Sequence, residues 1–231
     1  MTGIEYSVII KRMNNLLPDY PISNITISVE NREIQLTIIE DPDQFLDKLS
    51  KEDSDDVLYL PYWIYLWGSA IGLAQHIAKL DNSLSGKKVL EIGCGFGLLG
   101  IAASQTGANV VFTDFEHDAL LFARYNAQQN GVDPATIVQM DWNAVCFQSK
   151  FDVVLASDVI YEEQNWKPII ELLQELLTKN GVAIISEPNR DNAGGFFISL
   201  HENGFIFEKT TCNITVNRKT IPINIYTIKR K

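Results

Sequence analysis

Clusters of basic residues are scarce in this sequence, and their scarcity disfavours nucleic acid as a partner. The 231 residues include 19 Lys and Arg against 29 Asp and Glu, a formal net charge of -10. Proteins that bind DNA or RNA neutralise phosphates with grouped basic side chains, and here only Lys229, Arg230 and Lys231 form such a group. We therefore expect no nucleic-acid partner. The acidic surface either favours a cationic partner, such as a lysine-bearing protein or a small amine, or only keeps the protein soluble.

Cysteine is also rare, and long apolar runs are missing. Cys94, Cys146 and Cys212 are odd in number and widely spaced, which argues against a disulfide framework and against a metal site. The N-terminal residues do not resemble a signal peptide, and no run approaches the roughly 18 apolar residues of a membrane span. We expect a cytoplasmic location in a reducing environment, no membrane partner and a monomer.

The pattern that is present predicts an α/β protein. A hydrophobic content of 46% suffices for one sizeable core. The predicted strands are 88–92, 109–113, 136–140, 151–156 and 182–187, and the predicted helices are 68–80, 98–105, 116–130, 165–178 and 191–202. Short βα units in series predict a parallel, doubly wound sheet. Two last strands, 205–211 and 221–228, joined by a polar loop over 213–220, are candidates for an antiparallel pair at the sheet edge.

Residues 1–58 are predicted to form an N-terminal extension ahead of a main domain of residues 59–231. Apolar and polar residues alternate with period two over residues 25–39, around a polar turn at Asn31, which predicts a β-hairpin. An acidic stretch from residue 41 to residue 56 predicts a short helix and a solvated linker.

A glycine-rich turn follows the first predicted strand of the main domain. The segment from Val89 to Gly100 is an apolar strand that runs into glycines and opens a helix. Glycines allow positive φ and close approach of a ligand, at the strand end where open α/β sheets bind ligands. One interpretation is the dinucleotide fingerprint of Gly95, Gly97 and Gly100, with Asp114 downstream. That match is weak, because its first glycine does not directly follow the apolar run.

A second interpretation starts the turn directly at the strand end, with Glu91 followed by Gly93, Cys94 and Gly95. S-adenosylmethionine carries an ammonium, a carboxylate and a sulfonium but no phosphate, so a nearby carboxylate suits it and would repel a pyrophosphate. We therefore predict S-adenosylmethionine as the cofactor, with S-adenosylhomocysteine as its product, bound by these four residues. The alternative is a glycine turn that merely packs a helix on a strand.

Acidic residues end the next two predicted strands. Asp114 ends the second, where a carboxylate can accept hydrogen bonds from both ribose hydroxyls or cap the helix that starts near Glu116. Asp141 and Trp142 end the third, where an acceptor and a flat indole suit the amine and the π face of adenine. Taken alone, Trp142 would more often be a core aromatic. Its position makes it a candidate for cofactor binding together with Asp114 and Asp141.

Two further polar residues, Asp158 and Tyr161, follow the fourth strand at the switch point of the sheet, where a methyl acceptor should enter. Methyl transfer is an in-line displacement, so an enzyme mainly aligns an uncharged nucleophile, which a carboxylate or phenol can hold. Asp158 could also take a proton from an amine. We predict that both residues are catalytic. The alternative is that Asp158 caps the next helix and Tyr161 packs in the core.

Together these residues resemble the seven-strand protein methyltransferases called family 16, which includes lysine methyltransferases acting on chaperones, elongation factors and the electron-transfer flavoprotein β subunit. The resemblance covers about residues 59 to 190. The matching segments are Leu60 to Trp63, Leu66 to Ala70, Val89 to Gly100, Thr113-Asp114, Asp141-Trp142 and Asp158-x-x-Tyr161. It implies a Rossmann-like class I methyltransferase fold: a mostly parallel seven-stranded sheet with helices on both faces and an antiparallel edge strand, here preceded by the N-terminal β-hairpin.

The resemblance also implies roles for single residues. Trp67 would lie against the cofactor, Ser157 would line the cofactor site, and Asp158 and Tyr161 would face the acceptor. The turn from Ser186 to Arg190 departs from the Asp-Pro-Gly-Arg form of the flavoprotein-modifying branch. We expect a protein N-lysine methyltransferase; the alternatives are a small-molecule N- or O-methyltransferase and a catalytically inactive S-adenosylmethionine-binding module.

Overall fold

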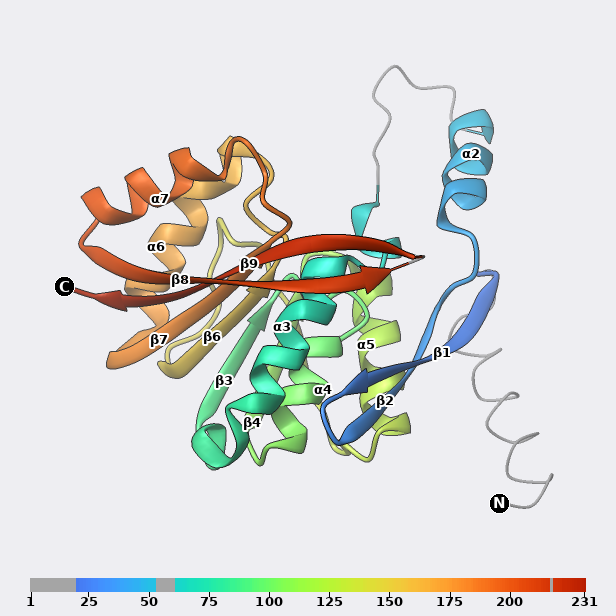
Figure 1. The fold of residues 1–231 in the computed structure, drawn as a ribbon, viewed down its shortest axis with the longest axis horizontal. Helices are drawn as coiled ribbons and strands as arrows, with labels where there is room; N and C mark the ends of the chain where they lie inside the picture. The colour runs from blue at the N-terminus through green and yellow to red at the C-terminus, as the bar shows by residue number, and fades with distance from the viewer. Residues whose placement is uncertain (1–19, 53–60, 217) are drawn as a thin grey trace.

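A seven-stranded sheet forms the centre of the molecule (Figure 1). The computed structural model describes residues 20–52, 61–216 and 218–231. In spatial order the strands are β5 (Thr136–Gln139), β4 (Asn109–Asp114), β3 (Lys88–Ile92), β6 (Phe151–Ser157), β7 (Leu177–Glu187), β9 (Lys219–Arg230) and β8 (Phe205–Val216). The first five are parallel, and β9 runs antiparallel to both of its neighbours. The predicted fold class is confirmed.

Helices cover both faces of this sheet (Figure 1). The helices α3 (Gly68–Lys79), α4 (Leu98–Gln105) and α5 (His117–Gln129) share one core with the sheet, and α6 (Trp166–Leu176) and α7 (Ala193–Glu202) share another. Neighbouring residues of a strand point to opposite faces, so Val89 packs in the first core and Leu90 in the second. All five predicted helices of the main domain are present. In the described part of the chain, no helix has the length and apolar character needed to cross a membrane.

The last two strands extend further than predicted. They pair from Phe205 with Arg230 to Val216 with Lys219, with β8 at the sheet edge and the reversed strand β9 beside it. The predicted polar loop over residues 213–220 is therefore wrong. Ile214 explains the difference: it is buried in the core under α3, and this burial fixes the strand although its neighbours are polar.

The predicted N-terminal hairpin is confirmed as β1 (Ile22–Val29) and β2 (Arg32–Ile39), which pair antiparallel along their whole length. Val29, Ile34 and Leu36 of the hairpin are buried in the same core as α3, α4 and α5, whereas Ile39 is buried in a separate cluster with Phe96 and Phe122. The acidic stretch forms α2 (Pro42–Glu52). The remainder of the predicted linker lies outside the described residues, and the boundary at residue 58 stays a prediction.

One buried side chain, that of Asn126 on α5, links the hairpin to α5 and to the turn after β3. Its oxygen accepts a hydrogen bond from the Thr37 N–H at 2.8 Å, and its nitrogen donates to the carbonyl oxygens of Thr37 at 3.1 Å and Phe96 at 3.0 Å. Phe96 belongs to the glycine turn after β3. Asn126 thus holds β2, α5 and the glycine turn together.

Replacing Asn126 with alanine is expected to lower the free energy of unfolding by about 3 kcal/mol, because buried backbone groups of Thr37 and Phe96 lose their partners. Urea denaturation followed by tryptophan fluorescence measures this change. Asn109 is the matched control: its exposed side chain makes one 3.3 Å bond to the Gly86 carbonyl, and its alanine variant should lose less than about 0.5 kcal/mol. Equal losses in the two variants would contradict the anchoring role.

Candidate active site

A cavity of about 610 Å³ lies at the carboxyl ends of the parallel strands β3, β4 and β6. Because these strands run in the same direction, the residues that follow them meet at one edge of the sheet. Every site residue predicted from the sequence lines this cavity: Trp67, Glu91, Gly93, Cys94, Gly95, Asp114, Asp141, Trp142, Ser157, Asp158 and Tyr161. The structure thus brings the whole predicted set together, whereas the role of each residue stays a prediction.

The glycine turn between β3 and α4 starts at Gly93, directly after the strand. Gly93, Gly95 and Gly97 have φ angles of 61°, 49° and 81°, in the left-handed region that favours glycine. The Gly95 N–H donates to the Asp114 carboxylate at 2.8 Å, which ties the turn to the end of β4. The spacing that begins at Gly93 is therefore the one that matches the observed turn.

Trp142 lies against this turn. A Cβ atom on Gly93 would come within 3.4 Å of the Trp142 ring and 3.1 Å of Val159. The preceding Asp141 accepts hydrogen bonds from the backbone and side-chain nitrogens of Asn143, at 2.8 and 2.9 Å. The half-buried indole packs partly on the core and also lines the cavity, so it presents a flat apolar wall there.

Asp114 is buried at the end of β4. One carboxylate oxygen accepts the Gly95 N–H and the other accepts the Glu116 N–H at 3.0 Å, beside the start of α5. Burial raises the pKa of Asp114 to about 6. Each carboxylate oxygen has two lone pairs, so both can accept a further hydrogen bond from a ligand.

Glu91, on β3, is hydrogen-bonded to the start of α4 on the far side of the glycine turn. Its side chain is buried, and its Oε2 accepts the Gly100 N–H at 2.9 Å in the first turn of α4. Burial, with a smaller contribution from Asp114, raises the pKa of Glu91 to about 8. The expected repulsion of a pyrophosphate therefore loses force near neutral pH, because it depends on a charge that burial disfavours. Direct contact of Glu91 with a cofactor stays a prediction.

The raised pKa makes the stability dependent on pH. Between about 4.5 and about 8 the folded protein holds a proton on Glu91 that the unfolded chain releases. The stabilisation that comes from this proton is therefore complete below about pH 4.5. It is lost as the pH rises to about 8, and the free energy of unfolding falls by up to about 1.4 kcal/mol per pH unit.

Replacing Glu91 with glutamine removes this dependence, because the amide oxygen can still accept the Gly100 N–H. The free energy of unfolding of the variant, relative to the wild type, should therefore rise between about pH 5 and about pH 8. Urea denaturation at several pH values measures it. Glu171, exposed on α6, provides the control substitution to glutamine, and a flat difference for the Glu91 variant would contradict the buried proton.

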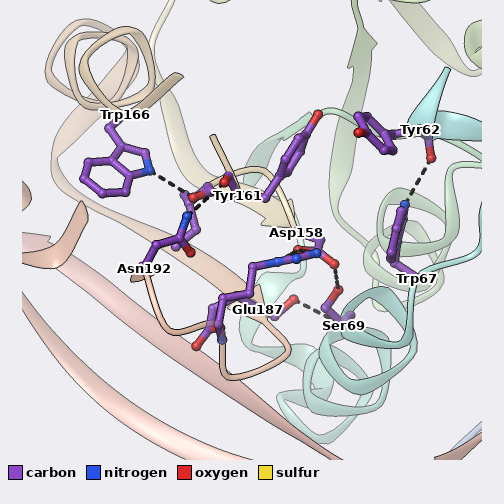
Figure 2. Close-up of polar contacts among 11 residues, drawn as sticks. Tyr62, Trp67, Ser69, Asp158, Tyr161, Trp166, Glu187 and Asn192 are labelled. Carbon is purple, nitrogen blue, oxygen red and sulfur yellow. Dashed lines mark hydrogen bonds and ion pairs between the residues drawn. The ribbon is translucent and has the colours of Figure 1, made fainter. Parts of the chain in front are cut away.

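Asp158 follows β6 and is only 6% exposed, with a φ of 55°. Its Oδ1 accepts a hydrogen bond from Arg190 Nε at 2.8 Å and forms an ion pair with Arg190 Nη2 at 2.8 Å. Its Oδ2 accepts a hydrogen bond from the Ser69 hydroxyl at 3.3 Å (Figure 2). The Asp158 N–H donates to the Ser186 carbonyl on β7 at 2.8 Å. These carboxylate bonds reach α3 and the loop after β7, so the alternative that Asp158 caps the next helix is not what the structure shows.

Aromatic rings surround this ion pair. The Arg190 guanidinium lies 6.0 Å from the centroid of the Trp67 ring and 5.9 Å from that of Tyr161. Tyr62 packs edge-on against Tyr161, and the Trp67 indole donates to the Tyr62 carbonyl at 3.1 Å (Figure 2). Burial raises the pKa of Tyr161 to about 12, so its phenol keeps the proton at neutral pH and can donate it in a hydrogen bond.

Sequence reasoning missed several residues of this region, among them Arg190, Ser69, Tyr62 and Phe115. Arg190 and Ser69 hold the Asp158 carboxylate, and Phe115, which is 58% exposed after β4, lines the cavity. The strand pattern does indicate that Arg190 lies near Asp158. The strands β6 and β7 are sequential βα neighbours, so the loops that follow them had to lie side by side.

The sheet order, the reversed β9 and the turn after β3 define a class I, Rossmann-like methyltransferase. The ribosomal protein L11 methylase of Lactobacillus delbrueckii subsp. bulgaricus shares this fold, with a TM-score of 0.62 and 21% identity over 89% of this chain and 98% of that one. So does the magnesium protoporphyrin IX methyltransferase of Synechocystis PCC 6803 with bound SAH, with a TM-score of 0.56 and 20% identity over 81% and 95%.

Residues 63–203 match the family described as lysine methyltransferase, methyltransferase family 16, and the chain belongs to this family. The predicted resemblance is confirmed. The histone-arginine methyltransferase METTL23 of Mus musculus is 34% identical over 131 residues, 54% of this chain and 51% of that protein. The protein N-lysine methyltransferase METTL21A of Mus musculus is 30% identical over 151 residues, 62% and 69%.

A third relative, the histidine protein methyltransferase 1 homolog of Dictyostelium discoideum, is 34% identical over 122 residues, 50% of this chain and 40% of that protein. The chain thus spans about half the length of METTL23 and less of the Dictyostelium protein. The names of the three relatives specify three different acceptor side chains, so family membership leaves the acceptor open.

Proposed function

We propose that the chain is an S-adenosylmethionine-dependent protein methyltransferase that modifies the Nε atom of a lysine side chain. One observation carries the proposal: the residues expected to hold the donor and those expected to face the acceptor line the same cavity. When bound, S-adenosylmethionine supplies a methyl group activated by its sulfonium.

The donor side of the cavity fits an adenosyl amino acid. Asp114 would accept hydrogen bonds from the ribose hydroxyls, since its oxygens keep free lone pairs beside their backbone bonds. Trp142 and Asp141 would hold the face and the amine of the adenine. At Gly93, which has no side chain, backbone groups remain accessible to the amino-acid part. Trp67, Cys94 and Ser157 complete the lining.

The acceptor side suits a long cationic side chain. The rings of Tyr62, Trp67 and Tyr161 offer apolar walls for the methylene groups of lysine, and Asp158 and the Tyr161 phenol offer polar groups to align its nitrogen. With the donor bound, the nitrogen lone pair would form the new bond to the methyl carbon, and the carbon–sulfur bond would break and leave its electrons on sulfur. The net charge of -10 further favours encounters with a basic protein.

Incubation of the purified protein with a methyl-labelled donor and cell lysate tests the proposal, with the Asp114→Ala variant as control. We expect label in protein, and methyl-lysine in the mass spectrum of the digested product. Label confined to low-mass products would favour a small-molecule acceptor. Methyl-arginine or methyl-histidine in the digest would show that the acceptor is arginine or histidine rather than lysine. Donor binding without any transfer would favour an inactive binding module.

We also propose a cytoplasmic location and the division into an extension of residues 1–58 and a methyltransferase domain of residues 59–231. Cys94, Cys146 and Cys212 are all free, which fits a reducing compartment. The hairpin at residues 22–39 is hydrogen-bonded to α5 through Asn126, which also bonds the glycine turn.

A further inference from the structure

The Asp158 carboxylate already has a cation as its partner. Arg190 donates a hydrogen bond from Nε at 2.8 Å and forms an ion pair through Nη2 at 2.8 Å with one oxygen of this carboxylate, and the side chains of Arg190 and Asp158 are 31% and 3% exposed. The backbone N–H of Arg190 donates to the buried Glu187 carboxylate, and its neighbour Asn189 has a φ of 56°. The guanidinium is thus held in place from both its side chain and its backbone.

The pair is neutral as a whole, and this matters for a nitrogen acceptor. A lone carboxylate stabilises an adjacent ammonium, which has no lone pair and cannot attack a methyl group. A carboxylate that is paired with a guanidinium offers little net negative charge to an incoming nitrogen. Acceptor nitrogens that approach Asp158 beside Arg190 are therefore not held in the protonated form.

The other titratable groups around the pair cannot replace this cation. Tyr161, after β6, and Glu187 of β7 act electrostatically on Arg190. The groups that act on Tyr161 besides Asp158 are Glu162, Tyr62 of η1 (Tyr62–Ile64) and Asp114 of β4. All are acidic or phenolic. Among the described residues, the cation that the structure places on Asp158 is Arg190.

We propose that Arg190 is a positioning residue for methyl transfer: its ion pair with Asp158 stops this carboxylate from holding the acceptor as an ammonium, so the nitrogen enters as the free base. This inference rests on the proposed function. The acceptor ammonium gives its proton to solvent as it enters. The lone pair then bonds to the methyl carbon, the carbon–sulfur electrons pass to sulfur, and the product is a methylated ammonium.

The dependence of kcat on pH tests this role, because kcat reports ionisations in the enzyme–substrate complex. The acceptor is the lysate protein that takes up most label with the wild type. In the Arg190→Gln variant the rising limb of the profile should move up by about one pH unit or more, since an unpaired carboxylate stabilises the acceptor ammonium. Arg190→Lys, which keeps the charge, should retain the wild-type limb.

A matched control removes the same charge elsewhere: Lys167→Gln, on the exposed face of α6, should leave the limb unmoved. Calorimetry with S-adenosylhomocysteine should give the wild-type affinity for all three variants, which shows that they are folded. A limb that does not move in Arg190→Gln overturns the inference while the proposed function stands. A limb that moves to lower pH also overturns it, because the unpaired carboxylate would then not hold the acceptor as an ammonium. If no lysine of any lysate protein is labelled, the proposed function fails, and the inference fails with it.

A second readout does not depend on turnover. The ¹⁵N–¹H signal of Arg190 Nε, assigned by its loss in Arg190→Lys, should remain protected from solvent exchange when S-adenosylhomocysteine is added. Fast exchange in that complex would show that the ion pair opens when the donor site fills, and would overturn the inference on its own.

Discussion

Replacing Asp158 with asparagine is expected to lower kcat/KM for the acceptor about hundredfold, because a misplaced or repelled nucleophile loses its alignment for in-line attack. Asparagine keeps the size of the side chain and tolerates the left-handed backbone at this position, where φ is 55°. It also leaves an acceptor for the Ser69 hydroxyl. What it removes is the ion pair, so the Arg190 cation faces the acceptor unpaired.

Steady-state kinetics with labelled donor measures this effect, and calorimetry with S-adenosylhomocysteine should show unchanged donor affinity. Asp152 is the matched control, since it lies at the other end of the same strand and accepts the Lys88 N–H at 3.0 Å. Its asparagine variant should keep full kcat/KM. An unchanged kcat/KM for Asp158→Asn, or equal losses in both variants, would show that Asp158 does not act on the acceptor.

Donor affinity should fall about hundredfold in Asp114→Ala, the second large effect. Two hydrogen bonds from ribose hydroxyls to a charged group are together worth about 3 kcal/mol, which corresponds to this factor. The variant also frees the Gly95 N–H, which now fastens the glycine turn to β4. Calorimetry with S-adenosylhomocysteine measures the loss, with Asp152→Ala as control. Intact affinity would show that the ribose does not bind at Asp114.

The pKa of Asp114 adds a pH dependence to the same titration. Burial raises this pKa to about 6, so the carboxylate is ionised above that value and protonated below it. Donor affinity should therefore be constant above about pH 7 and should fall by up to about tenfold per unit below pH 6. In Asp114→Ala the affinity should be low and independent of pH in this range.

The parallel part of the sheet was predictable because its strands are short apolar runs bounded by turn residues, covered on both faces. The strand ends were predictable for the same reason. Once the strands are parallel, Asp114, Asp141 and Asp158 must meet at one edge. The lengths of β8 and β9 were not predictable, because the polar residues around Ile214 read as a loop and its burial depends on α3, which is distant in sequence.

Within the site, the directions of individual side chains were the main feature that the sequence could not predict. The sequence places a carboxyl at Glu91 but does not say that it turns to the Gly100 N–H. It places Asp158 near the acceptor but does not reveal its pairing with Arg190, which lies 32 residues away. That pairing requires β6 and β7 to be adjacent and the loop after β7 to turn back through the left-handed Asn189.

A crystal structure of the protein with S-adenosylhomocysteine tests the central claim most directly. We predict the adenine on Trp142, the ribose hydroxyls on Asp114 and the amino-acid end at the turn that starts at Gly93. A nucleoside bound outside this cavity, or a turn that remains closed to it by side chains, would contradict the assignment of the donor site.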